Sequence, residues 1–134
     1  SGADFAPHPW LPAVLELREQ LQQACAGSFN SVLLNRYRDG RDSMGWHSDD
    51  EPELGATPLI ASLSLGASRR FLLRRRDDPA QKFECLLGHG DLLLMRGHCQ
   101  RDYQHALPKT ARVSGERINL TFRQIAAVPR RAGR

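Results

Sequence analysis

The chain has 134 residues, of which 40% are hydrophobic and 25% charged. That composition is ordinary for a soluble globular protein, and the length suits one domain with a single hydrophobic core. No apolar run approaches the roughly 20 residues of a membrane-spanning helix, and no secretory signal pattern is present. The net charge of +4 permits a polyanionic partner.

The cysteines bear on the compartment of the protein. Cys25, Cys85 and Cys99 are odd in number and far apart. Without a Cys-x-x-Cys pair, a disulfide framework or a thiolate zinc site is disfavoured. We therefore expect a cytoplasmic protein, which we take to be monomeric and without a membrane partner.

The first predicted element is an amphipathic helix over residues 11–25. Apolar residues recur there at helical spacing, Pro12 fits the first turn, and Gly27 fits the stop. We expect this helix to cover one face of a sheet and to carry no chemistry.

The rest of the chain reads as short strands separated by Gly- and Pro-containing turns. In the turn over residues 38–42, Gly40 is expected to supply a tolerant backbone. The expected strands cover residues 29–37, 46–49, 59–65, 69–75, 82–87, 92–95 and 117–123. Such spacing predicts an antiparallel sandwich or an open barrel.

A candidate metal site begins at His47 and Asp49. Residues two apart in an extended segment point to the same side, so both side chains can meet one ion. His105 arrives far enough along the chain for strands to intervene and return it beside His47. Two histidines and one carboxylate with open positions are typical of non-haem Fe(II) oxygenases.

Other histidines compete for the third position. His89 and Asp91 form a second His-x-Asp, but two glycines flank His89 in what reads as a hairpin turn. A flexible turn holds a ligand less well than a strand does. We therefore expect Asp91 to be a turn residue, and His8 and His98 to be exposed.

The terminal strand separates into two faces. An alternation of period two places one set of side chains toward the covering layer and the other toward the interior. The apolar set is Ile118, Leu120 and Phe122, and the polar set is Arg117, Asn119, Thr121 and Arg123. Buried arginines need anions, and a dicarboxylate would pair with them; an exposed face with two salt bridges is the alternative.

Taken together, these segments resemble the AlkB family of Fe(II)- and 2-oxoglutarate-dependent dioxygenases, which repair alkylated nucleic-acid bases. The similarity extends from about residue 11 to residue 125 and is greatest to the DNA-repair branch. It is carried by Asn35-Arg36-Tyr37, His47-Ser48-Asp49-Asp50-Glu51, His105 and Arg117-Ile118-Asn119-Leu120-Thr121-Phe122-Arg123. The resemblance implies a mainly β fold with a covering helix, closed as a double-stranded β-helix, or jelly-roll.

The resemblance also implies roles for individual residues. Fe(II) would be held by His47, Asp49 and His105. The cosubstrate 2-oxoglutarate would be held by Asn35, Tyr37, Arg117, Asn119 and Arg123. Glu51 matches the acidic position that lies against the damaged base.

The implied reaction is oxidative demethylation of N-alkylated bases in DNA. It would use Fe(II), 2-oxoglutarate and O2 and release succinate, CO2 and formaldehyde, on a base that has left the duplex stack. Two other readings stay open: a related oxygenase acting on RNA or on a protein side chain, and a nonenzymatic nucleic-acid binder. The Asp50-Glu51 pair and the basic charge favour a nucleobase over a peptide.

Two further expectations concern the limits of this core. We expect residues 1–134 to form a single catalytic core that lacks the family's N-terminal substrate lid, because no stretch before Leu11 is long enough to form one. The densest basic cluster is Arg69, Arg70, Arg74, Arg75 and Arg76. We expect it to be a solvated face, only part of which can follow a phosphate track.

Overall fold

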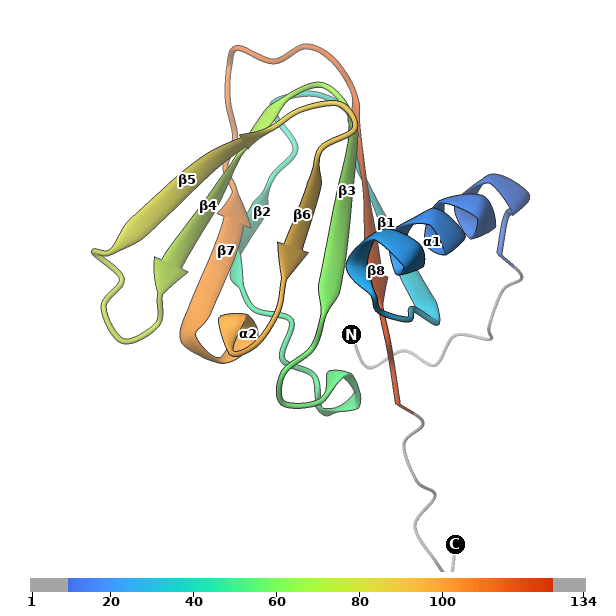
Figure 1. Cartoon of the computed structure of the whole chain (residues 1–134). Helices are drawn as coiled ribbons and strands as arrows, with labels where there is room; N and C mark the ends of the chain where they lie inside the picture. The colour runs from blue at the N-terminus through green and yellow to red at the C-terminus, as the bar shows by residue number, and fades with distance from the viewer. Residues whose placement is uncertain (1–9, 127–134) are drawn as a thin grey trace, which may run out of the picture.

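Two four-stranded antiparallel sheets make up most of the computed structural model, which describes residues 10–126 (Figure 1). One sheet has the order β1 (Ser31–Tyr37), β8 (Arg117–Arg123), β3 (Ile60–Gly66) and β6 (Leu92–Met95). The other has the order β2 (Met44–His47), β7 (Tyr103–Leu107), β4 (Arg69–Arg75) and β5 (Lys82–Leu87). The expected mainly β, antiparallel class is confirmed. The expectations for His8 and the other residues of 1–9 lie outside the described residues.

All seven predicted strands are present, and one strand was missed. The missed strand is β7, which carries His105 and is preceded by the short helix α2 (Cys99–Asp102). A 3-10 turn, η1 (Pro52–Leu54), lies within the predicted loop. Polar residues occupy β7 because its interior face lines a site, so its sequence lacks a clean apolar alternation.

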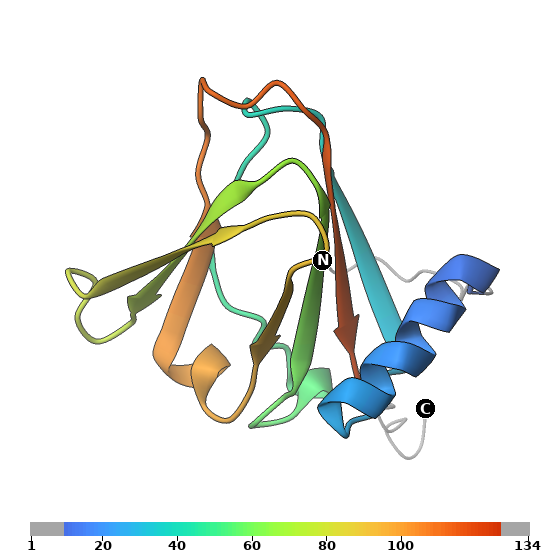
Figure 2. The same cartoon turned by 45° about the horizontal axis from the view of Figure 1, so that its top comes forward.

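Helix α1 (Pro12–Cys25) covers the sheet that contains β1 and β8, on the side away from the other sheet (Figures 1 and 2). The contact is apolar: Leu21 packs with Phe29, Leu120 and Phe122, and the ring of Trp10 stacks 6.2 Å from that of Phe122. The predicted covering role is confirmed. Within residues 10–126 no helix combines the length and apolar character needed to cross a membrane.

A second apolar cluster lies between the two sheets. It draws on strands of both, and its buried members are Tyr37, Ile60, Phe71, Leu87, Met95 and Leu107. Burial of this many large side chains holds the sheets face to face. Several of these side chains also line a pocket that contains polar residues.

The turn over residues 88–91 is not the hairpin that the sequence suggested. It links β5 of one sheet to β6 of the other. Asp91 Oδ2 accepts the Gly88 N–H at 2.7 Å, so Asp91 is a turn residue as expected. His89 Nδ1 accepts the N–H of Gly66 at 2.9 Å, which ties His89 to the end of β3.

Gly40 is required for close approach rather than for a special backbone angle. A Cβ at this position would lie 1.9 Å from the carbonyl oxygen of Thr110. The two segments are joined by a backbone bond from the Thr110 N–H to the Gly40 carbonyl at 2.9 Å. The turn over residues 38–42 is therefore packed against the segment that follows β7.

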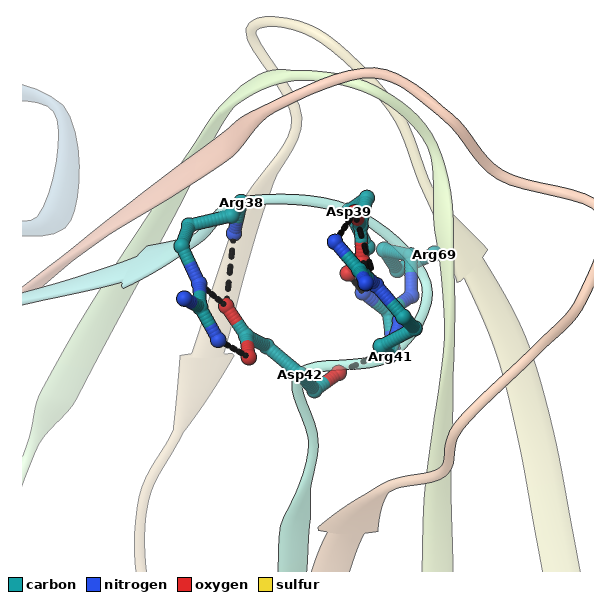
Figure 3. A network of polar contacts seen from close by, with 5 residues as sticks. All are labelled: Arg38, Asp39, Arg41, Asp42 and Arg69. Carbon is teal, nitrogen blue, oxygen red and sulfur yellow. Dashed lines mark hydrogen bonds and ion pairs between the residues drawn. The ribbon is translucent and has the colours of Figure 1, made fainter.

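Arg69 corrects the expectation of a solvated basic face. Only 1% of this residue is exposed. Its guanidinium donates to the carbonyl oxygens of Asp39 at 3.1 Å, Asp42 at 2.8 Å and Pro108 at 2.8 Å. Figure 3 shows it behind the turn in which Asp39 and Asp42 form ion pairs with Arg41 and Arg38. Arg69 is a buried tie between loops.

The other members of the basic cluster are divided among separate partners. Arg70 pairs with Glu84, Arg75 with Asp77 and Arg76 with Asp50. Arg74 lies 4.2 Å over the ring of Trp46 and donates to the side chain of Gln104. Because three of these charges are already neutralised by carboxylates, the cluster does not act as one continuous phosphate track.

Candidate metal and cosubstrate site

Three of the predicted residues meet at the end of β2. His47 pairs directly with His105 across the β2–β7 ladder, and their ring centroids are 4.2 Å apart. Asp49 follows the strand, and its Oδ2 lies 3.9 Å from His105 Nε2. One ligand atom from each residue falls within 4.8 Å of the others. Phe71 stacks 5.3 Å from His105 and closes that side.

The electrostatics of this group suit a bound cation. Burial, assisted by the neighbouring His47, lowers the pKa of His105 to about 4, so its imidazole is neutral and retains a lone pair. Burial also raises the pKa of Asp49 above its ordinary value. A divalent ion would neutralise a buried carboxylate and accept both lone pairs. Nitrogen and oxygen donors in this ratio fit Fe(II).

The orientation of the His47 ring is fixed by the backbone. Its Nδ1 lies 2.9 Å from the carbonyl oxygen of Gly45. Because a carbonyl oxygen only accepts, Nδ1 carries the proton and Nε2 is left available. Such a bond is the usual support of a metal-binding histidine, where it sets both tautomer and ring direction.

The five predicted cosubstrate residues lie on two adjacent strands. The β1–β8 register places Tyr37 opposite Arg117 and Asn35 opposite Asn119. These four side chains and Arg123 line the same pocket as the two histidines and Asp49. The structure thus brings both predicted sets of residues to one cavity between the sheets.

Two arginines of this pocket lack a carboxylate partner among residues 10–126. Arg117 is 2% exposed, and its guanidinium donates to Ser64 Oγ at 2.9 Å and Asn119 Oδ1 at 3.3 Å. The Nε atoms of Arg117 and Arg123 are buried without a partner among residues 10–126, and neither side chain forms an ion pair there. The alternative of an exposed face with two salt bridges is therefore wrong. Burial lowers the pKa of Arg117, and a bound carboxylate would offset that cost.

A polar network that the sequence reading missed holds Asn119 in place. Ser62 Oγ donates to Asn119 Oδ1 at 2.8 Å, and Asn119 Nδ2 donates to Thr121 Oγ1 at 2.8 Å. Ser62 and Ser64 are 5% and 1% exposed. Their shared parity inside an otherwise apolar strand is the signal that could have identified this inward polar face.

Arg69 adds a second buried cation to the same end of the pocket. The guanidinium carbons of Arg69 and Arg117 lie 5.6 and 5.2 Å from the centre of the Tyr37 ring. Burial raises the pKa of the Tyr37 hydroxyl, which stays protonated. This end of the cavity is therefore polarised to receive an anion.

Glu51 lies apart from the pocket. It is exposed and precedes η1, where its carbonyl oxygen accepts the Leu54 N–H at 3.0 Å. Its position two residues past Asp49 keeps it outside the group of three ligand candidates. A role in base recognition stays a prediction.

A family comparison agrees with this chemistry. The model of the 2OG-Fe(II) oxygenase superfamily matches residues 2–123 of the chain. The chain belongs to this superfamily, and its expected cofactors, Fe(II) and 2-oxoglutarate, are those of the family.

Individual relatives refine that placement. The mouse alpha-ketoglutarate-dependent dioxygenase alkB homolog 3 is 44% identical over 143 residues, which cover 100% of this chain and 50% of the relative. The bovine DNA oxidative demethylase ALKBH2 is 39% identical over 138 residues, which cover 98% of this chain and 50% of the relative. The resemblance to the AlkB family is thus confirmed, and the chain spans about half the length of these curated relatives.

A solved structure supports the fold alone. The structure of OsALKBH1 superposes with a TM-score of 0.64 at 23% sequence identity, covering 87% of this chain and 67% of that chain. At this identity the likeness concerns the arrangement of the strands.

Proposed function

We propose that this chain catalyses oxidative demethylation of N-alkylated bases in DNA, using Fe(II), 2-oxoglutarate and O2 and releasing succinate, CO2 and formaldehyde. One observation carries the proposal: a cluster of two histidines and one carboxylate opens into the same pocket as Arg117 and Arg123, whose buried Nε atoms have no partner among residues 10–126. The relative named DNA oxidative demethylase supports DNA as the substrate.

In this proposal His47, Asp49 and His105 hold the iron. When bound, Fe(II) would supply the activation of O2 that couples decarboxylation of 2-oxoglutarate to oxidation of the alkyl group. The protein's contribution is positional. His47 presents Nε2 because Gly45 holds Nδ1, and burial keeps the His105 imidazole neutral.

The dicarboxylate would lie along the inward face of β8. Burial raises the pKa of Asp49, and the nearby His47 and Arg123 oppose that rise, so Arg123 lies on the metal side and would pair with the carboxylate there. Arg117, beside Tyr37, would pair with the distant carboxylate. Asn35 and Asn119 would orient the same ligand. Because residues six apart on a strand span about 20 Å, the two arginines must lean toward each other to bind one small molecule.

The finer architecture also belongs to this proposal. Consecutive strands change sheets at every step except β4 to β5, which gives two interleaved antiparallel sheets of four strands each. That connectivity supports a double-stranded β-helix, or jelly-roll. We further propose that residues 1–134 act as a single catalytic core and that the protein works as a cytoplasmic monomer.

The substrate enters from the side of Asp49 and Glu51 in this scheme. Alkylated adenine and cytosine can be cationic, so the exposed Glu51 carboxylate would favour them electrostatically. The base must leave the stack to reach the buried metal ligands. The chain's net charge of +4 would support approach to a polyanion.

The test compares substrates under identical conditions. The chain is incubated with Fe(II), 2-oxoglutarate and an oligodeoxynucleotide carrying N1-methyladenine, and formaldehyde is measured against succinate. A ribo-oligonucleotide with the same lesion and a peptide pool serve as alternatives, and Asp49→Ala is the inactive control. Greater turnover on RNA or peptide than on DNA would overturn the proposed substrate.

A further inference from the structure

We infer that Gln100 is a positioning residue for the metal ligand Asp49, acting through the Asp49 backbone. This inference rests on the proposed metal role of Asp49. Gln100 lies on α2, and only 3% of it is exposed. Its Oε1 accepts the backbone N–H of Asp49 at 2.8 Å. Since a backbone N–H only donates, that bond fixes which end of the amide faces Asp49.

The other end of the amide is fixed as well. Gln100 Nε2 donates to Met95 Sδ at 3.5 Å. Sulfur is a weak acceptor, so this contact orients the side chain more than it stabilises it. Burying the amide of Gln100 costs desolvation free energy, which an apolar side chain of similar size would not. The amide is therefore better explained by its bond to the Asp49 backbone than by packing alone.

The backbone of Asp49 needs such support because the β ladder does not reach it. Strand β2 ends at His47, and its pairing with β7 is irregular between Met44 and His47. Beyond His47, residues 48–50 have no regular structure. Without another anchor, the carboxylate of Asp49 would swing with its loop.

Two anchors of this loop come from one short segment, in addition to the ion pair that Arg76 forms with Asp50. Ser48 Oγ donates to the Tyr103 carbonyl at 2.6 Å, and Gln100, five residues after Met95, accepts from the backbone N–H of Asp49. The same segment continues directly into β7, which carries His105. The residues 99–105 thus hold one ligand and fasten the loop of another, so the spacing between His105 and Asp49 depends on Gln100.

The experiment measures metal affinity directly. Co(II) is titrated into metal-free protein with 2-oxoglutarate present, and its visible absorption bands report both occupancy and geometry. Gln100→Met has nearly the same length without the acceptor, and we expect it to weaken binding by about tenfold or more and to alter the bands. Gln100→Glu retains an oxygen acceptor, and we expect its affinity to stay within about threefold of the parent.

A matched control separates positioning from general packing. Gln104→Met changes the same residue type four positions later, where the amide contacts Arg74 instead of the ligand loop. Its Co(II) affinity and bands should equal those of the parent. Parental affinity and bands in a folded Gln100→Met would overturn the inference. If that variant does not fold, Gln100→Glu decides alone, since a tenfold loss there would overturn it too.

Failure of this inference differs from failure of the proposed function. Asp49→Ala should abolish specific Co(II) binding if the metal site is correct. If Asp49→Ala lost Co(II) binding while Gln100→Met kept the parental affinity, only the role of Gln100 would be rejected. Unchanged binding in Asp49→Ala would reject the metal site itself, and with it the inference.

Discussion

His47 and His105 face each other across β2 and β7, with their rings edge to face and 4.2 Å between centroids. His105 is only 6% exposed, and its burial, assisted by the neighbouring His47, lowers the pKa of the His105 imidazole. With Asp49 beside them, the pair forms a preorganised donor set.

Removal of one ligand should remove the metal. We expect His105→Gln to weaken Co(II) binding by at least about tenfold. An amide oxygen is a weaker metal ligand than an imidazole nitrogen, and it would not occupy the position of the His105 nitrogen. Titration with optical detection measures this. His89→Asn is the matched control: it tests the competing His-x-Asp and keeps an acceptor for the Gly66 N–H. Equal losses in both variants would contradict the assignment.

Arg117 should determine the affinity for 2-oxoglutarate. Arg117→Met removes a charge-assisted bond of about 1.5–3 kcal/mol, which corresponds to roughly 10- to 150-fold weaker binding. Metal affinity should be nearly unchanged, because Arg117 lies beside Tyr37 rather than the histidines. Calorimetry measures both, with 2-oxoglutarate titrated into metal-loaded protein and Co(II) titrated into metal-free protein. Arg36→Met, an exposed arginine paired with Glu116, should change neither.

Glu51 should affect demethylation of the base more than turnover of the cosubstrate. We expect Glu51→Gln to lower demethylation of an N1-methyladenine oligonucleotide while 2-oxoglutarate turnover without DNA is retained. The reason is electrostatic, since the exposed carboxylate lies beyond the ligands and near an approaching cationic base. Glu53→Gln, on η1, is the control. A parallel fall in both activities would show that Glu51 merely supports the metal loop.

Local alternation explains what the sequence alone could predict. The period of two in β8 placed Arg117, Asn119 and Arg123 on the inward face and Leu120 beneath α1, as the structure has them. The same argument put His47 and Asp49 on one side, where both lie, although β2 ends at His47 and Asp49 belongs to the loop that follows. These inferences need only the geometry of a single strand.

Partners brought together by folding were beyond that reasoning. Arg69 reads as one more arginine of a basic run, but three carbonyls from two distant loops bury it. Gln100 likewise has no local pattern, since its partner lies in the loop after β2. Such polar contacts depend on pairing between sheets, which periodicity along one segment does not specify.

Arg69 gives the final prediction, which concerns stability. Arg69→Met would leave the carbonyls of Asp39, Asp42 and Pro108 without this donor. Asp39 and Asp42 belong to the turn shown in Figure 3, which Gly40 packs tightly against Thr110. An unsatisfied buried polar group costs about 1–3 kcal/mol, so we expect the free energy of unfolding to fall by about 3 kcal/mol or more.

Urea unfolding of the metal-free protein measures that loss, and the neighbouring residue supplies the control. Arg70→Met removes an exposed ion pair with Glu84 and should leave the free energy of unfolding nearly unchanged. Arg69→Lys keeps the charge beside Tyr37 but not the three bonds. We therefore expect it to lose stability while its 2-oxoglutarate affinity falls less than in Arg117→Met. If Arg69→Met were as stable as Arg70→Met, the buried bonds would not hold the loops together.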